Sequence, residues 1–333
     1  MYSLLLAIGS FFTFMELNCE NLFDCYHDSL KNDYEYLPTG SRQWTPKKYW
    51  HKVNSIAKVV IACSPSFDND TRLPDLVALC EVENDTVMTA LTKRSLLRNA
   101  HYRYLMTNSE DQRGIDVALL YRETFTPIRH YPLRIKRKED MRPTRDILYV
   151  SGTMNSHDTL HIFVLHAPSR LGGEMKSRPF RMAVAQRLCE STDSITAINP
   201  DANIIIAGDF NDYAGDAPLR AIATHNLHDA TAKAKGKNGA KGTYRYKGRW
   251  GSLDHIFVSE TIRQRIHSVY INDMPFLTEE DKTHGGRKPC RTYNGPKYQR
   301  NGFSDHLPLV MNINIQEVKG QVTTDKEWIQ DPY

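Results

Sequence analysis

Acidic, amide and histidine side chains cluster at points where short apolar stretches of the chain end or begin. Apolar runs lead into N-C-E-N, E-V-E-N, H-A-P-S-R and G-D-F-N-D, and two further groups, L-D-H and S-D-H, precede apolar runs. One such group is more often a cap or a turn, because Asp and Asn are common turn residues. Six groups at strand ends indicate one functional site, since a sheet holds the side chains at its edge at fixed spacing.

The types of these side chains predict hydrolysis at phosphorus assisted by a hard cation. Carboxylate and amide oxygens without paired cysteines suit Mg²⁺ or Mn²⁺, and we place Glu81 and Asp305 at the metal. The reaction also needs a group that orients the attacking water and takes its proton, and donors that neutralise charge on the phosphoryl oxygens. The residues that supply those parts are Asp209, Asn211, His166 and His306.

Apolar stretches rich in Val, Ile, Leu and Phe predict the strands that must carry these groups. They are Phe11–Asn18, Asp75–Val82, Ile115–Tyr121, Ile147–Met154, Leu160–His166, Ala202–Gly208, Ser252–Val258 and Leu309–Ile315. A helix is expected to begin after Thr45, with Pro46 at its first position. Further helices are expected over Glu174–Ile195 and Asn84–Leu97. This many strands predicts a core dominated by sheet.

The length of 333 residues allows one large domain or two ordinary ones. No internal repeat and no Pro/Gly/Ser-rich stretch divides the chain, so we expect a single domain over 11–316. A short apolar leader, 1–10, and a polar tail, 317–333, flank it. With 40% hydrophobic and 25% charged residues, the composition excludes a disordered or collagen-like chain.

The cysteines and the apolar amino-terminal run indicate whether the chain carries a zinc or redox motif and whether it is exported. Six cysteines stand at long spacings without a C-x-x-C pair, which argues against a zinc ribbon or a redox motif. The apolar run from Met1 to Met15 is shorter than the roughly 18 residues that span a bilayer, so no stable membrane insertion is expected. The run is either a first strand with a short leader or a signal remnant. The first basic residue is Lys31, and the missing basic region favours the cytoplasm over export.

Long irregular stretches cover Asp24–Trp44, Ala230–Gly251 and Asp281–Ser304, and the last two are rich in Lys and Arg. The net charge is only +4, so the distribution of charge matters more than its total. Basic runs are usually solvated loops, but both lead into acidic motifs, where a phosphate substrate would be drawn in. The sequence T-Y-R-Y-K-G-R-W at 243–250 interleaves aromatic and basic residues, which favours nucleic acid. The alternative is a loop whose aromatic rings pack back onto the sheet.

The order of the motifs resembles that of the endonuclease/exonuclease/phosphatase superfamily. The chain reads N-x-E-N at 18–21, L-C-E-V-E-N at 79–84, R-G-I-D-V-A-L-L-Y at 113–121, H-A-P-S-R-L-G-G at 166–173, G-D-F-N-D at 208–212, S-L-D-H-I-F-V at 252–258 and S-D-H-L-P-L at 304–309. G-D-F-N or S-D-H alone is a weak signal, whereas the full series in order is specific. The resemblance is strongest to a bacterial branch with N-x-E-N-L-F-D and R-G-I-D-V-A. It implies an α/β fold, a four-layer α-β-β-α sandwich of two packed mixed β-sheets flanked by helices.

The resemblance also implies a role for each matching residue. Asn18 would hold the phosphate and a metal-bound water, Glu81 would be the main metal ligand, and Asp305 would lie near the metal. The implied cofactor is Mg²⁺ or Mn²⁺.

The remaining implied roles concern the water and the phosphate. Asp209 would orient the attacking water, and Asn211 would steady the phosphate. His306, supported by Asp254, would bind the scissile phosphate. His166 stands where deoxyribonucleases of the family carry His and abasic-site endonucleases carry Tyr, which implies contact with the phosphate or the leaving group.

One departure from the bacterial branch affects substrate choice. The fourth motif commonly reads H-W-P-S-R there, whereas Ala167 takes the place of the Trp here, so an aromatic platform beside the phosphate is missing. Four further residues are weaker candidates for contact with the phosphate: Arg113, Arg170, Arg291 and Tyr293. A role as surface or structural residues explains each of them equally well.

The sequence therefore predicts a divalent-metal-dependent phosphoesterase that hydrolyses phosphodiester bonds, with nucleic acid as the favoured partner. A phosphatase or phosphodiesterase for a small molecule or lipid head group remains open, because the family includes inositol phosphatases and sphingomyelinases. A catalytically inactive binding protein would have lost at least one catalytic residue, and the set is complete. Oligomeric state is not predicted.

Overall fold

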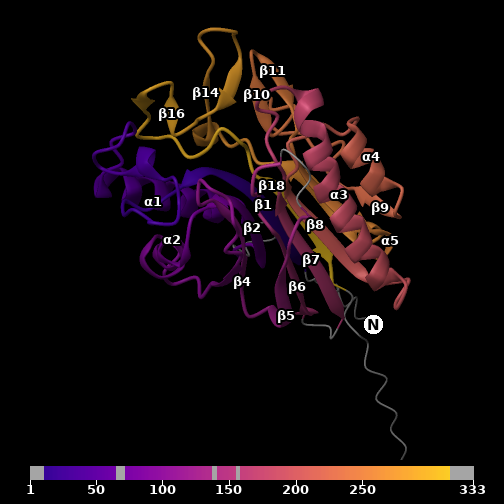
Figure 1. Ribbon diagram of the computed structural model, residues 1–333. Helices are drawn as coiled ribbons and strands as arrows, with labels where there is room; N and C mark the ends of the chain where they lie inside the picture. The colour runs from indigo at the N-terminus through magenta and orange to yellow at the C-terminus, as the bar shows by residue number, and fades with distance from the viewer. Residues whose placement is uncertain (1–10, 65–71, 137–140, 155–157, 316–333) are drawn as a thin grey trace, which may run out of the picture.

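Two six-stranded sheets pack face to face in the computed structural model, which describes residues 11–64, 72–136, 141–154 and 158–315 (Figure 1). The first sheet has the order β13 (Ile266–Ile271), β18 (Leu309–Asn314), β1 (Phe11–Leu22), β2 (Leu76–Val82), β4 (Asp116–Tyr121) and β3 (Arg103–Met106). The second has the order β5 (Phe125–Leu133), β6 (Ile147–Met154), β7 (Thr159–His166), β8 (Asn203–Asp209), β12 (Asp254–Ser259) and β9 (Leu227–Asp229).

Helices cover the outer faces of both sheets. On the side of the first sheet lie α1 (Pro46–Ala62) and α2 (Asp85–Thr89), and on the side of the second lie α3 (Glu174–Thr196), α4 (Ala217–Ala223) and α5 (Glu260–Arg263) (Figure 1). The expected α/β sandwich of two mixed sheets flanked by helices is therefore confirmed. Within the described residues, no helix is long and apolar enough to cross a membrane.

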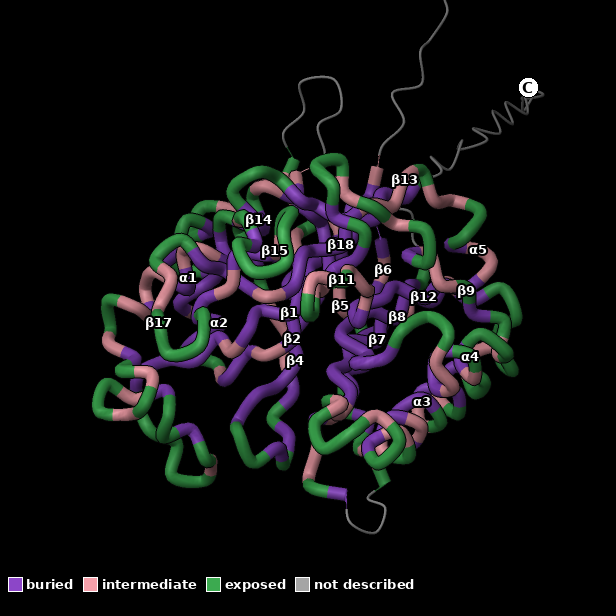
Figure 2. Tube along the Cα trace, turned by 90° about the horizontal axis from the view of Figure 1, so that it is seen from above, coloured by how far each residue is buried: buried purple, intermediate pink, exposed green. Residues whose placement is uncertain are grey.

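The alternation of side chains along a strand explains why both faces of the second sheet are buried. In β8, Ile205 and Ala207 join the core between the sheets, whereas Ile204 and Ile206 join the core beneath α3 and α4. Successive side chains of a strand point to opposite faces, so a continuous apolar run is what a doubly covered strand requires. Figure 2 shows the buried residues following the strands, with exposed residues on the loops and outer helix faces.

Strand direction brings the polar strand ends to one edge of the molecule. β1 runs parallel to β2, and β7 runs parallel to β8, with His166 opposite Asp209. β12 runs antiparallel to β8, so its first residue, Asp254, also lies opposite Asp209. Four strands therefore end, and β12 begins, at the same edge.

Every predicted strand is present, with ends displaced by a few residues at most. β1 alone continues further, to Leu22. The first two predicted helices are confirmed as α1 and α3, but the third was predicted too long. Asn84 caps it through Val87 N at 3.0 Å, the α-helix ends at Thr89, and a π-helical turn, η2 (Ala90–Arg94), follows.

Several elements escaped prediction because their sequences lack the regular spacing of apolar residues that marks a strand or a helix. β5 is exposed over most of its length. The stretches predicted as irregular contain the short 3₁₀ helix η1 (Tyr34–Tyr36), two whole two-stranded hairpins and the second strand of a third. Another short 3₁₀ helix, η3 (Pro275–Leu277), precedes that third hairpin. The hairpins are β10 (Tyr244–Tyr246) with β11 (Arg249–Gly251), β14 (Thr278–Glu280) with β15 (Arg287–Pro289), and β16 (Tyr293–Asn294) with β17 (Lys297–Tyr298). The predicted leader and polar tail lie outside the described residues.

Candidate active site

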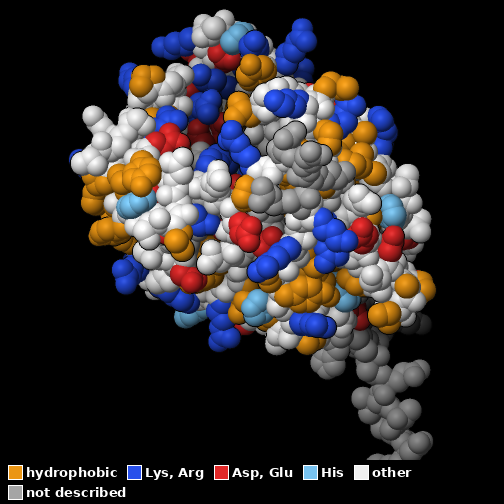
Figure 3. Space-filling view, in the orientation of Figure 1, with side chains coloured by type: hydrophobic (Ala, Val, Ile, Leu, Met, Phe, Trp, Pro, Cys, Tyr) orange, Lys and Arg blue, Asp and Glu red, His pale blue; other side chains and the backbone are white. Residues whose placement is uncertain are grey.

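A cavity of about 400 Å³ opens at the edge where the strand ends meet. Predicted site residues in its wall are Asn18, Glu81, Arg113, His166, Asp209, Asn211, Arg291, Tyr293, Asp305 and His306. Asp254 is fully buried behind the wall. On the face shown in Figure 3, carboxylates lie recessed behind Lys and Arg side chains in the region below β14. The structure thus gathers residues from both ends of the chain around one hollow.

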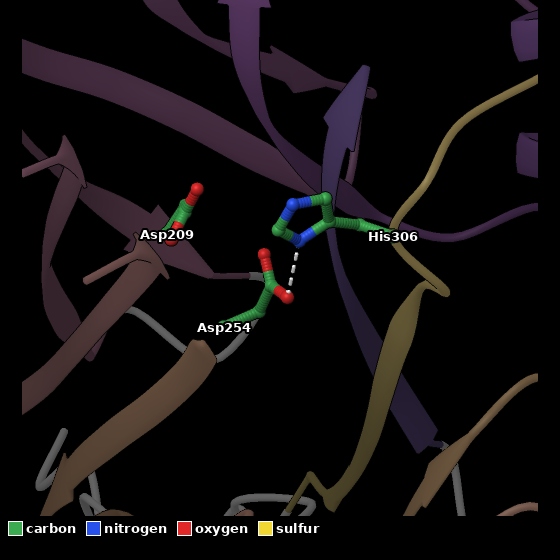
Figure 4. Close-up of side chains that lie close together, drawn as sticks. All are labelled: Asp209, Asp254 and His306. Atoms are coloured by element: carbon green, nitrogen blue, oxygen red, sulfur yellow. Dashed lines mark hydrogen bonds and ion pairs between the residues drawn. The ribbon is translucent and has the colours of Figure 1, made fainter. Parts of the chain in front are cut away.

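Asp209, Asp254 and His306 point toward one another at the centre of the site (Figure 4). One potential ligand atom from each lies within 4.8 Å of the others. Asp254 Oδ2 accepts hydrogen bonds from His306 Nδ1, at 2.7 Å, and from the Thr243 hydroxyl. The two carboxyl groups come from the second sheet, and His306 comes from the segment leading into β18 of the first.

The charge of His306 follows from its carboxylate neighbours. Burial opposes protonation of the ring, but the charge and hydrogen bond of Asp254, together with the charges of Asp209 and Asp305, outweigh it. The pKa of His306 is therefore raised well above its usual value, and the ring is a cation at neutral pH.

Asp209 is held on both carboxyl oxygens. Oδ1 accepts from Asn211 N at 2.8 Å, and Oδ2 accepts from Asn18 Nδ2 at 3.0 Å. Burial, followed by the negative charge of Asp254, raises the pKa of Asp209 to about 7. A carboxyl group with a pKa near neutrality can both release and accept a proton under physiological conditions.

Strained backbone places several side chains of the site. Glu20, Asn21, Glu81 and Asn211 all have φ between 50° and 60°, a left-handed conformation that non-glycine residues adopt at a cost. The first three accompany irregularities in the pairing of β1 with β2 and of β2 with β4. Such a bulge redirects a side chain at a strand end.

Gly208 is required by the close approach of two parallel strands. Its φ is 145°, and a Cβ atom there would lie 1.8 Å from Leu165 O. Any side chain would push β8 away from β7 and displace Asp209, the next residue. This accounts for the glycine in the G-D-F-N-D motif.

His166 and Glu81 face each other across the cavity wall. His166 Nε2 lies 3.7 Å from Glu81 Oε1 and 3.6 Å from Asp209 Oδ2. Burial and the positive charges of Arg145 and Arg113 hold the pKa of His166 well below its usual value, so the ring is neutral. Glu81 Oε2 accepts from Asn21 N at 2.8 Å, which fixes the carboxyl group while leaving Oε1 toward the histidine.

Arg291 bridges two carboxylates on the other side of the cavity. Its Nη2 lies 3.0 Å from Asp305 Oδ2 and 3.2 Å from Glu20 Oε1. Glu20 Oε2 accepts from Thr292 N at 2.6 Å, and the buried ammonium of Lys52 donates to Thr292 Oγ1 at 2.5 Å. The segment carrying Arg291 is thereby tied to both β1 and α1.

The other weaker candidates for phosphate contact have different surroundings. Arg113 is exposed on the cavity wall, and Tyr293 is buried there with its hydroxyl donating to Arg42 O at 2.8 Å. Arg170 donates to Asp216 Oδ2 at 2.7 Å and is not in the wall of the cavity. Ala167, which replaces the Trp of the bacterial branch, is buried.

A family model described as Endonuclease/Exonuclease/phosphatase family matches residues 13–315. The chain belongs to this family. It is accordingly a hydrolase that acts on phosphate esters. No curated protein sequence matches the chain.

Solved structures of the endonuclease/exonuclease/phosphatase fold resemble this one closely in topology. A family protein from Bacteroides thetaiotaomicron is 15% identical, with a TM-score of 0.60 over 92% of this chain and 98% of that one. Truncated TDP2 from Caenorhabditis elegans is 16% identical, with a TM-score of 0.56 over 92% and 98%. The mannosyl-6-phosphatase Bt3783 of B. thetaiotaomicron is 16% identical, with a TM-score of 0.55 over 90% and 98%. At these identities the likeness concerns the fold.

The donor set of this family member suits a hard divalent cation. Asp254 Oδ1 is buried without a hydrogen-bond partner among the described residues, and so are both carboxyl oxygens of Glu16. Glu81 and Asp305 add further carboxylate oxygens to the wall of the same cavity. Buried carboxylates in excess of buried cations are costly unless positive charge is supplied, so the residues present fit Mg²⁺ or Mn²⁺.

The structure adds residues that sequence reasoning missed. Glu16 is fully buried near Asp209 and Asp254, and Lys52 is buried and donates to Thr292. Tyr244, from the stretch of interleaved aromatic and basic residues, has its ring 5.0 Å from that of His306. One signal was available, because Glu16 is an acid inside the otherwise apolar stretch F-F-T-F-M-E-L, and acids are rarely buried without reason. Lys52 gave no such signal, since lysine is ordinary in an amphipathic helix.

Proposed function

We propose that this phosphoesterase is a divalent-metal-dependent phosphodiesterase that cleaves nucleic acid, with the predicted site residues in the roles expected of them. The observation that carries the proposal is the convergence of Asp209 and His306 in the wall of a cavity that also presents Glu81 and Asn211, with Asp254 buried behind that wall. This set contains an oriented base, a buried cation and amide donors, which hydrolysis at phosphorus requires.

Asp209 is the group that activates water. Asn18 and the Asn211 backbone hold its carboxylate in place, and its pKa of about 7 lets it accept the proton of an attacking water at neutral pH. The water oxygen forms the new bond to phosphorus while the bond to the leaving oxygen breaks. A divalent cation held by Glu81 and Asp305 would supply Lewis-acid polarisation of the phosphoryl group.

Donors around the cavity balance the charge that develops on the phosphoryl oxygens. His306 is held as a cation by Asp254, and the neutral His166 is held near Asp209. The Asn211 amide is fixed by its Nδ2, which donates to Ala167 O at 3.1 Å. Groups that are fixed before the substrate arrives stabilise the transition state without reorganisation.

Cations near the cavity favour an anionic polymer over a small ester, although not every basic residue is available. Arg245 forms an ion pair with Asp281 at 3.3 Å, and its guanidinium lies 5.7 Å from the centre of the Trp250 ring. Arg245 and Trp250 therefore already contact other parts of the protein and are less available to a substrate. Tyr246 and Lys247 at the tip of the β10–β11 hairpin are exposed. Further exposed lysines on the preceding loop are Lys233, Lys235, Lys237 and Lys241.

The second candidate is a phosphatase or phosphodiesterase for a small molecule or lipid head group. A structure of the same fold is that of a mannosyl-6-phosphatase, and the fold therefore accommodates small substrates. Substrate size separates the two candidates.

The experiment compares substrates at fixed Mg²⁺ or Mn²⁺, with EDTA as the blank. We expect hydrolysis of bis-p-nitrophenyl phosphate and of DNA or RNA, with little activity toward inositol phosphates or sphingomyelin. Exchange of the four loop lysines for Ala should raise KM for nucleic acid and flatten its salt dependence, because fewer counterions are released. Turnover of the small diester serves as the control. Efficient hydrolysis of only the small or lipid substrates would favour the second candidate.

A further inference from the structure

A second, larger groove adjoins the active-site cavity. Its volume is about 740 Å³, and it shares Arg113 and Ser169 with the wall of the cavity. Three segments line it: 111–113 ahead of β4, 141–145 ahead of β6, and 168–180 at the start of α3. Of the residues that line it, the sequence patterns gave a function only to Arg113.

Cations predominate on the polar surface of this groove. Arg142 and Lys176 are exposed in its wall, as is Arg113 at the junction with the cavity. Arg145 is buried and paired with the single acid of the groove, Asp111, at 3.1 Å. The three exposed cations therefore have no acid of the groove left to neutralise them. Phe180 and Leu171 add apolar surface between the charges.

Contacts through the backbone connect the groove to the catalytic residues. Arg145 Nη2 donates to Ala167 O at 2.9 Å, and Asn211 Nδ2 donates to the same oxygen. Ala167 follows His166, whose Nε2 lies 3.6 Å from Asp209. The groove therefore begins beside the catalytic carboxylate.

The cavity extends in another direction, past Asp305 and Arg291. Its far wall contains Arg42, Tyr293 and Gly295, and the Arg42 guanidinium lies 4.8 Å from the centre of the Tyr293 ring. Arg42 is one-third exposed, and its Nε pairs with Glu35 Oε2 at 3.3 Å while Nη1 donates to Gly295 O at 3.4 Å, so the guanidinium is held flat at this end of the cavity with its charge partly balanced. An arginine plane backed by an aromatic ring is a surface on which a base can stack.

From this arrangement, and resting on the proposed phosphodiesterase function, we propose that a nucleic-acid strand runs through the site and is cut internally. The strand continues on one side into the groove of Arg142 and Lys176, and on the other into the arm of Arg42 and Tyr293. The scissile phosphate lies between them at Asp209. A chain with a phosphate at each nucleotide matches cations on both sides of the catalytic residues, whereas a monoester occupies only the centre.

The first test uses a substrate without ends. Closed circular single-stranded DNA and a linear strand labelled at its 5′ end are incubated with the full-length protein and Mg²⁺. Nicking of the circle, and labelled fragments of intermediate length from the linear strand, are expected. An intact circle beside a linear strand shortened stepwise from one end would overturn internal cutting.

The second test asks whether the groove binds the nucleic-acid strand. The Arg142→Ala/Lys176→Ala variant should lower kcat/KM for the circle about tenfold at low salt and reduce the salt slope by about 1.4, since each of the two phosphate contacts contributes about 0.7 on single strands. The matched control is Arg94→Ala/Arg103→Ala, which removes two exposed cations that line neither hollow. The control should behave as wild type. Equal losses in both variants, or none in either, would remove the groove from the strand's path.

The outcomes separate this inference from the function on which it rests. If bis-p-nitrophenyl phosphate is not hydrolysed in the presence of metal, the proposed phosphodiesterase function fails. If the small diester is hydrolysed but the circle stays intact, only the inference of a continuous strand fails. If the groove variant instead loses activity toward sphingomyelin vesicles, the groove receives a lipid, and a nucleic-acid strand is excluded from it.

Discussion

The ring of His306 is oriented by Asp254, which accepts a hydrogen bond from its Nδ1 at 2.7 Å and leaves Nε2 for other partners. Asp254 begins β12 of the second sheet, and His306 precedes β18 of the first. The bond therefore spans the two sheets and forms only when they pack. The Tyr244 ring packs against the same imidazole, with the two ring centres 5.0 Å apart.

Replacement of Asp254 should change the pH profile of the enzyme. Loss of the negative charge in Asp254→Asn lowers the pKa of His306, because the charge that outweighs burial is gone. The alkaline limb of kcat/KM against pH should move to lower pH by about one unit or more. NMR titration of His306 should show the same displacement. An unchanged titration would mean that His306 does not depend on Asp254 for its proton.

The catalytic assignment predicts large losses of rate with little loss of structure. Asp209→Asn and His306→Ala should each lower turnover about 10²–10³-fold, the usual effect of removing one electrostatic group from a catalytic site. Asp209→Asn should melt near the wild-type temperature in the presence of metal, whereas His306→Ala leaves the buried Asp254 carboxylate without its cation and should melt lower, so its turnover is compared per folded molecule. If either variant kept more than about a third of wild-type activity, a loss far smaller than the one expected, the assignment would be refuted.

The stability of the metal-free protein should fall as pH rises toward neutrality. The pKa of Asp209 is about 7 in the folded protein against an ordinary value of 3.8, so the folded state binds the extra proton between these limits. Unfolding then releases a proton, and the free energy of unfolding decreases with rising pH over that window. The free energy of unfolding of Asp209→Asn and of wild type is measured by denaturation in EDTA at pH 5 and at pH 8. The variant should become more stable relative to wild type by on the order of 2 kcal/mol from pH 5 to pH 8. A constant difference between the proteins would contradict the shift.

Glu16 should be a residue whose removal stabilises the fold. Burial, followed by the charges of Asp254 and Asp209, raises its pKa well above the usual value, and neither carboxyl oxygen has a partner among the described residues. Glu16→Met keeps the volume and should raise the free energy of unfolding by about 1–3 kcal/mol in the absence of metal. Glu16→Gln, which still buries a polar group, is the control and should gain less. A destabilised Glu16→Met protein would show that the carboxyl group has a structural role.

Metal dependence should be complete. Activity should vanish in EDTA and return with Mg²⁺ or Mn²⁺, because the available ligands are hard oxygen donors. Glu81→Gln keeps a polar group in the bulge that accepts from Asn21 N, so the fold should survive while the metal concentration for half-maximal activity rises at least tenfold. Undiminished turnover by metal-stripped enzyme in EDTA would contradict the proposal.

Local sequence determined the strands and the chemistry they carry. The apolar run Ala202–Gly208 predicts a buried strand, observed as β8 over Asn203–Asp209, and the G-D-F-N-D motif predicts a polar group at its end, because both depend on neighbouring residues alone. Strands with little burial, such as β5, escaped prediction because tertiary pairing stabilises them.

The electrostatics of the site were decided by tertiary structure. Asn18 donates to Asp209 across 191 residues of sequence, and Arg291 donates to Glu20 across 271. Neither separation leaves a periodic trace in the sequence, so the raised pKa of Asp209 could not be predicted from it. Packing of the two sheets removes these carboxyl groups from water and brings them close together. Burial and proximity of charge are properties of the folded molecule, and they set which groups carry a proton.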